Sequence, residues 1–204
     1  MVVTKVEMMT KIKYKVYLDE QLAFVLYKGE LSHYRISEGA LLEEETVQEI
    51  LQKVISKRAK LRAMHLLEDM DRSEAALREK LVQGLYPEEA IETAISYVRS
   101  FGYLDDARYA MNFVQSRKSS KSRREILYQL CQKGISKETA KEAVEAGFDQ
   151  EDETDAIRRI LEKKRVDPGT ATPQQMQKLY GYLARKGFRY EDIRQVIQNY
   201  DENA

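Results

Sequence analysis

The sequence predicts a mainly α-helical protein with a small N-terminal β segment. Helix-forming residues dominate the chain of 204 residues, which contains only three prolines and nine glycines. Apolar residues alternate with a period of two within the first forty residues and follow helical spacing after them. One pattern, a helix end followed at once by a second helix start, occurs three times. We therefore expect three tandem three-helix repeats that stack into an elongated, curved array.

The N-terminal segment, residues 1–45, predicts a β-hairpin or a three-stranded meander. In KIKYKVYL, residues 11–18, apolar and aromatic residues alternate mainly with lysines. The polar residues DEQ interrupt this pattern, and a second apolar run, LAFVLY, occupies residues 22–27. Because so small a sheet is marginally stable alone, we expect it to pack on the helices or on a partner.

Each helical repeat contains the same type of helix end. A helix stops at a glycine, an apolar residue follows directly, and an acidic residue lies in the first turn of the next helix. Glycine takes the left-handed conformation at little cost, and the apolar residue packs back on the helix it leaves. The acid favours the positive end of the next helix dipole. The glycines are Gly84, Gly134 and Gly187, followed by Leu85, Ile135 and Phe188.

The spacing of these glycines leaves room for one more helix per repeat, at about residues 57–71, 104–117 and 152–164. The first repeat is one residue shorter than the others between its last helical leucine and its glycine. We place the repeats at residues 46–102, 103–148 and 149–204.

Two adjacent aspartates in GYLDDARYA, residues 102–110, raise the question of a metal or catalytic pair. Their context favours a helix start instead, because Gly102 ends the preceding helix, Asp105 stands at the N-cap position and Asp106 lies in the first turn. Neighbouring helical residues point about 100° apart, so the two carboxylates do not converge on one ion.

Other signs of chemistry are missing from the sequence. The chain has two histidines and no HExxH, phosphate-binding GxxxxGK, GxGxxG or GxSxG motif. We therefore expect no catalytic residue, no metal site and no cofactor, and we classify the protein as a non-enzyme. The one cysteine, Cys131, cannot form an internal disulfide and suits a reducing cytoplasm. No apolar run is long enough for a bilayer, and the lack of a long heptad seam favours a monomer.

The most informative polar stretch is RKSSKSRR, residues 117–124, in a chain whose net charge is zero. Acidic residues suit a helix start better, so five cations here are locally unfavourable. A phosphate backbone or an acidic protein surface would compensate them, and a solvated loop is the alternative. Other cations lie in the first and third repeats, and if the repeats stack, some of them could share one face with this stretch. The candidate residues are Arg117, Lys118, Lys121, Arg123, Arg124, Arg158, Arg159, Lys163, Lys164, Arg185, Lys186 and Arg189.

Tyrosines near these cations have two interpretations. They could stack nucleobases. Their helical spacing beside apolar residues favours core or boundary positions for most of them. The tyrosines concerned are Tyr103, Tyr109, Tyr128, Tyr180, Tyr182 and Tyr190.

Together these residues resemble the RecX family, bacterial regulators of the RecA recombinase. The resemblance covers nearly the whole chain. It rests on GYLDDARYA, on the helix ends QKGI and RKGF, and on RSEAALREKL at residues 72–81. RISEGALLEEETVQEI, residues 35–50, is similar to the extension carried by Gram-positive-type members.

The resemblance implies a non-enzymatic protein of three-helix repeats that binds the RecA filament on single-stranded DNA, along its groove. It further implies inhibition of recombinase, ATPase and coprotease activity. A target that is part protein and part DNA agrees with a net charge of zero. Two alternatives stay open from the residues alone. One is an autonomous nucleic-acid-binding protein, for single-stranded or duplex DNA, and the other is a helical scaffold that binds only proteins.

Overall fold

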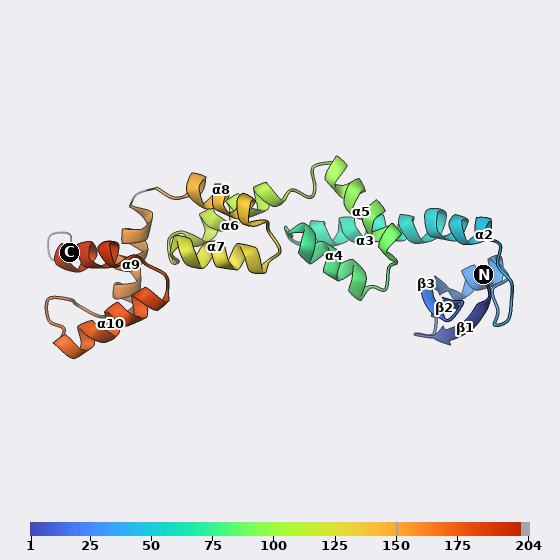
Figure 1. The fold of residues 1–204 in the computed structure, drawn as a ribbon, viewed down its shortest axis with the longest axis horizontal. Helices are drawn as coiled ribbons and strands as arrows, with labels where there is room; N and C mark the ends of the chain where they lie inside the picture. The colour runs from blue at the N-terminus through green and yellow to red at the C-terminus, as the bar shows by residue number, and fades with distance from the viewer. Residues whose placement is uncertain (150, 201–204) are drawn as a thin grey trace. The chain divides into compact units, whose positions relative to one another are not determined.

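The computed structural model describes residues 1–149 and 151–200 (Figure 1). The chain divides into two compact units, Met1–Asp105 and a second unit that begins at Asp106. The first unit contains a three-stranded sheet and the first helical repeat, and the second contains the other two repeats. The predicted class, a mainly helical fold of three-helix repeats with a small N-terminal β segment, is confirmed.

The N-terminal sheet is an antiparallel meander with the strand order β1-β2-β3. Val16 in the central strand pairs with Val6 and Phe24 on either side. The inner face of the sheet is apolar, because every second residue of a strand points to the same side. Val3, Val16 and Phe24, one from each strand, are fully buried there. Asp19 has a positive φ at the tight turn between the second and third strands. The strands are β1 (Val3–Met8), β2 (Lys13–Leu18) and β3 (Gln21–Tyr27).

A short helix, α1 (Lys28–His33), comes after the sheet. A helical segment made of α2 (Glu44–Glu49) and η1 (Ile50–Ile55) then leads into α3, the first helix of the first repeat. The backbone stays right-handed helical through both junctions of that segment, so residues 44–69 form one continuous helix with a π-helical stretch. α3 packs on α5 through small residues, and Ala63 and Ala94 are fully buried. The helices of the repeat are α3 (Ser56–Asp69), α4 (Glu74–Gln83) and α5 (Glu88–Ser100).

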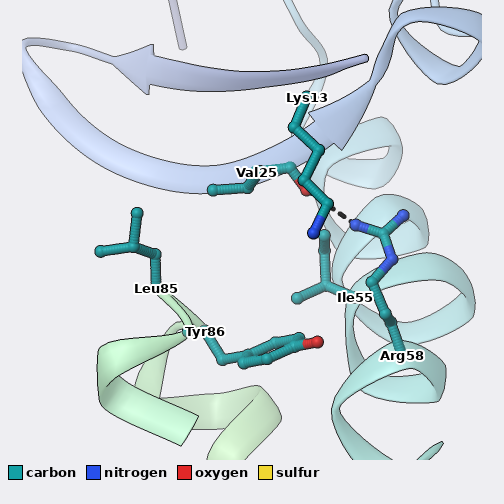
Figure 2. Close-up of a pocket in the computed structure, with 7 residues that line it drawn as sticks. Lys13, Val25, Ile55, Arg58, Leu85 and Tyr86 are labelled. Carbon is teal, nitrogen blue, oxygen red and sulfur yellow. Dashed lines mark hydrogen bonds between the residues drawn. The ribbon is translucent and has the colours of Figure 1, made fainter. Parts of the chain in front are cut away.

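Arg58 of α3 links the sheet to the first repeat through hydrogen bonds (Figure 2). Its guanidinium donates to the backbone carbonyl of Val25 at 2.9 Å and to the carboxylate of Glu30 at 2.6 Å, and it lies 4.5 Å from the ring centre of Tyr27. A cavity of about 30 Å³ beside these residues has room for water alone. Tyr86 lines this cavity, and burial raises the pKa of its hydroxyl. The sheet therefore packs on its own helices.

The second unit repeats the three-helix arrangement twice. α6 packs on α8, and α9 packs on α11. α6 and α8 can cross closely because Gly147 has no side chain. A Cβ at this position would lie only 2.6 Å from Cγ1 of Val114. The second repeat consists of α6 (Asp106–Arg117), α7 (Arg123–Gln132) and α8 (Lys137–Gly147). The third consists of α9 (Asp152–Lys164), α10 (Pro173–Arg185) and α11 (Tyr190–Gln198).

The helix ends at Gly134 and Gly187 have the expected left-handed backbone, with φ of 81° and 90°. After each glycine, the apolar residue donates its backbone N–H to the carbonyl of a buried leucine five residues earlier. The N–H of Phe188, for example, donates to the carbonyl of Leu183 at 3.2 Å.

In the first repeat this expectation is wrong by one residue. Gly84 has φ of −76°, Leu85 is the left-handed residue with φ of 59°, and Tyr86 donates to the carbonyl of Leu81. The first repeat is therefore not shorter, because Leu85 rather than Gly84 corresponds to Gly134. Gly84 has a different role, since a Cβ there would lie 2.9 Å from the Tyr86 ring.

The two aspartates of GYLDDARYA lie at a helix start. Gly102 has φ of 69°, Leu104 is buried, and Asp105 directly precedes α6, whose first residue is Asp106. Within residues 1–149 and 151–200, no group of three metal-ligating side chains comes together. None of the helices in these ranges is both long enough and apolar enough to cross a membrane.

Candidate nucleic-acid interface

The basic stretch at residues 117–124 lies on the seam between the second and third repeats. The first turn of α9 is acidic, with Asp152, Glu153 and Asp155, and the first two of these residues face the basic stretch. Nζ of Lys118 lies 3.0 Å from Oδ2 of Asp152, and the backbone N–H of Arg123 donates to Oε1 of Glu153 at 3.0 Å. Opposite charges that the sequence separates by about thirty residues therefore meet inside one unit.

Arg123 is held from three sides. Its guanidinium lies 4.9 Å from the ring centre of Phe148, donates to the backbone carbonyl of Asp149 at 3.0 Å, and faces the buried carboxylate of Glu153 at 3.6 Å. A buried carboxylate with a fixed cationic partner is costly to separate from it. Arg123 therefore has a structural role at the seam.

Asp152 receives two hydrogen bonds at the seam. Burial by itself raises the pKa of this carboxyl, but the backbone N–H of Asp149, at 2.7 Å, and the ammonium of Lys118 outweigh that effect. The pKa of Asp152 is lower than its ordinary value as a result. The contact is thus made by the charged form.

A basic groove of about 530 Å³ opens beside the seam. Arg159 and Lys163 are four residues apart on α9, so they occupy the same helix face. Nζ of Lys164 lies 4.0 Å from the ring centre of Tyr182 on α10. The groove is lined by Ser119, Ser120, Lys121, Glu125, Arg159, Ile160, Lys163, Lys164, Tyr182 and Lys186.

A second groove, of about 540 Å³, adjoins the basic groove. We call it the tyrosine groove because Tyr128, whose exposed fraction is 64%, lies on it. Glu125 and Lys186 line both grooves, and Oε1 of Glu125 lies 3.7 Å from Nζ of Lys186. The tyrosine groove is lined by Arg124, Glu125, Tyr128, Gln129, Ala184, Arg185, Lys186 and Gly187.

The structure separates the predicted binding residues into groups. Lys118 and Arg123 join the two repeats, and Arg158 pairs with Asp155 on its own helix at 3.0 Å. Arg117 is exposed near the Phe113 ring, and Arg189 is exposed before α11. The two grooves bring together the remaining predicted cations, Lys121, Arg124, Arg159, Lys163, Lys164, Arg185 and Lys186.

Sequence reasoning missed Glu125, which is the sole carboxylate among the described residues that line the two grooves. Its Oε1 lies 2.5 Å from Nζ of Lys121, four residues earlier. That i, i+4 spacing was the available signal. Donor groups thus dominate both grooves, and this arrangement suits a polyanion.

Family models of the first, second and third three-helix domains of RecX match residues 59–97, 105–144 and 151–197. A "Regulatory protein RecX" from Caldanaerobacter subterraneus subsp. tengcongensis is 32% identical, over 91% of this chain and 92% of the relative. Another, from Clostridium botulinum strain Alaska E43, is 31% identical, over 96% and 94%.

Solved structures agree with these relatives. A crystal structure of regulatory protein RecX has a TM-score of 0.61 and 25% identity, over 95% of this chain and 98% of that one. The fold is also that of RecX from Lactobacillus salivarius, with a TM-score of 0.60 over 72% of this chain and 96% of that one, at 22% identity. The three matched domains coincide with the three helical repeats of the structure, and the chain belongs to the RecX family.

Proposed function

We propose that this protein binds the filament that RecA forms on single-stranded DNA and inhibits its recombinase, ATPase and coprotease activities, without catalysing a reaction. Membership of the RecX family, whose relatives are named regulatory proteins, supports a regulatory role. Such a partner also implies that the protein acts in the bacterial cytoplasm. We further propose that it acts as a monomer.

The observation that carries the proposal is the contrast between two sets of cations at one seam. Lys118 and Arg123 are neutralised by acids of the same chain, whereas Arg159 and Lys163 form no ion pair with any described residue. Clustered cations repel one another. A groove in which such cations lack acidic partners from the same chain therefore attracts an external polyanion. The DNA of a nucleoprotein filament, or an acidic surface on its protein, would supply one.

Autonomous binding to nucleic acid is the second candidate function, and the same grooves favour it. The two functions differ in which ligand the protein binds most tightly. We would label the protein fluorescently and titrate it with RecA filaments on an oligonucleotide, with the naked oligonucleotide, and with RecA free of DNA. The filament proposal predicts the tightest binding to filaments. Equal affinity for the filament and the naked oligonucleotide, with steep salt dependence, would favour autonomous binding instead.

A further inference from the structure

We propose that Glu125 lowers the affinity of the basic groove for the phosphates of a single-stranded nucleic acid. The inference deepens the proposed function and rests on it for the biological setting. Its chemistry rests on the groove alone, so the two can fail separately.

The polar groups on the groove walls select an anion. Lysine and arginine side chains are hydrogen-bond donors without acceptor capacity, and the hydroxyl of Ser119 can donate as well. Five cations face one carboxylate in the basic groove, namely Lys121, Arg159, Lys163, Lys164 and Lys186 against Glu125. Phosphate oxygens match such a donor set.

The aromatic side chains favour a nucleic acid over an acidic protein surface. The exposed Tyr128 lies on the adjoining tyrosine groove together with Arg124 and Arg185, whereas Lys164 covers the Tyr182 ring. A cationic groove beside an exposed ring suits single strands, since the backbone follows the charges while an unpaired base stacks on the ring. Paired bases would not offer their faces, so a single strand fits better than a duplex.

Glu125 opposes the binding of phosphates in two ways. Its carboxylate lies 2.5 Å from Nζ of Lys121 and 3.7 Å from Nζ of Lys186, and its single negative charge offsets part of the positive charge of these two lysines. Its own charge also repels a phosphate that enters the groove. Gln129 donates to the same oxygen at 3.1 Å, so the carboxylate is fixed in place. The protein then binds naked single strands weakly, and additional contacts with the filament are needed for tight binding.

The decisive experiment measures the anisotropy of a labelled single-stranded oligothymidylate, titrated with the protein in the absence of RecA. Glu125→Gln keeps the side-chain shape and removes the charge. A charge of this kind a few ångströms from a phosphate at a solvated surface changes affinity by roughly three- to tenfold, so we expect tighter binding by about that factor. Glu125→Asp retains the charge, and we expect no tightening from it.

A charge-reversal pair tests the groove itself. We expect Arg159→Glu with Lys163→Glu to weaken oligothymidylate binding by roughly tenfold or more, because two phosphate contacts are replaced by repulsion. Lys137→Glu with Arg194→Glu is the matched control. These are exposed cations on α8 and α11 that line neither groove, and we expect binding to stay within about twofold. Circular dichroism and thermal melting verify the fold of each variant.

Each result has a defined meaning. If neither the Arg159/Lys163 pair nor Glu125→Gln alters oligothymidylate binding, the groove is not the nucleic-acid site. If the pair weakens binding but Glu125→Gln leaves it unchanged, or if Glu125→Asp tightens it equally, the role of Glu125 is wrong. If polyglutamate displaces the oligonucleotide from the groove at equal charge concentration, the ligand is an acidic protein surface. RecA inhibition that persists through any of these failures leaves the proposed function standing.

Discussion

The hydroxyl of Ser122 donates a 2.7 Å hydrogen bond to the backbone carbonyl of Lys186. The same oxygen accepts a hydrogen bond from the backbone N–H of Glu125 at 3.1 Å, which caps the start of α7. Lys186 is the C-cap of α10, and Ser122 is fully buried. One small side chain therefore joins a helix start in the second repeat to a helix end in the third.

We expect Ser122→Ala to lower the free energy of unfolding by about 2–3 kcal/mol. Roughly 1 kcal/mol comes from the lost N-cap, and the remainder from leaving the Lys186 carbonyl at the seam without its donor. Ser136→Ala is the matched control, because Ser136 caps α8 by accepting from Thr139 but is exposed. It should cost only about 1 kcal/mol. Urea unfolding followed by circular dichroism measures both, and equal losses would contradict the role of Ser122 at the seam.

Gly187→Ala should destabilise the protein more than Gly102→Ala, because a Cβ at Gly102 would have no atom of the described residues within 4 Å apart from its chain neighbours. Both glycines have a left-handed backbone, which costs a residue with a Cβ about 1–2 kcal/mol. At Gly187 the new Cβ would also lie 2.8 Å from the hydroxyl of Ser122 and 3.1 Å from Cβ of Arg124. Thermal melts of the two variants compare them directly. A smaller loss for Gly187→Ala than for Gly102→Ala would mean that the seam is loosely packed.

The contact between Lys118 and Asp152 should make stability depend on pH in the acid range. The pKa of Asp152 is lowered in the folded protein, so its contribution is fully present above the unfolded pKa of about 4 and is lost as the pH falls through the folded pKa. Asp152→Asn should therefore be less stable than the parent near neutral pH, and the difference should shrink below about pH 4.

Asp149→Asn is the control for this experiment, because Asp149 lies 3.9 Å from Lys118 with a side chain that is 90% exposed. An ion pair so exposed contributes little. Urea unfolding at a series of pH values separates the two. A stability difference for Asp152→Asn that is the same at every pH would show that the charge of Asp152 does not matter.

Arg58→Lys should loosen the N-terminal sheet from the first repeat. A lysine cannot reach Val25 and Glu30 together with a planar fork, and it stacks less well on Tyr27. We expect a loss of about 1–2 kcal/mol, seen as faster hydrogen exchange in the three strands. Arg62→Lys, an exposed position on the same helix, should leave exchange unchanged.

The helical repeats could be predicted because glycine and a following apolar residue mark a helix end through local backbone chemistry. That reasoning worked at Gly134 and Gly187 and misplaced the first helix end by one residue. Leu85 takes the left-handed conformation there although leucine disfavours it, and Leu85 and Tyr86 line a cavity together with Val25 of the sheet. Tertiary contacts of this kind leave no local signal.

The candidate site was predictable as a set of cations and not as a geometry. The sequence contains a basic stretch at residues 117–124 and a group of acids at the start of α9, but only the fold reveals that Lys118 and Arg123 pair with these acids while Arg159 and Lys163 do not. Pairing across about thirty residues depends on how two repeats pack. Local spacing therefore found which residues carry charge, and packing decided which of them face a groove.

The most direct test of the central claim is the DNA-dependent ATPase of the cognate RecA on single-stranded DNA, titrated with this protein. We expect ATPase activity to fall when far less than one molecule of the protein is present per RecA monomer, because the protein acts on the filament. A fall only when the protein is abundant enough to coat the DNA would contradict the account and favour competition for DNA. An unchanged ATPase would contradict it as well.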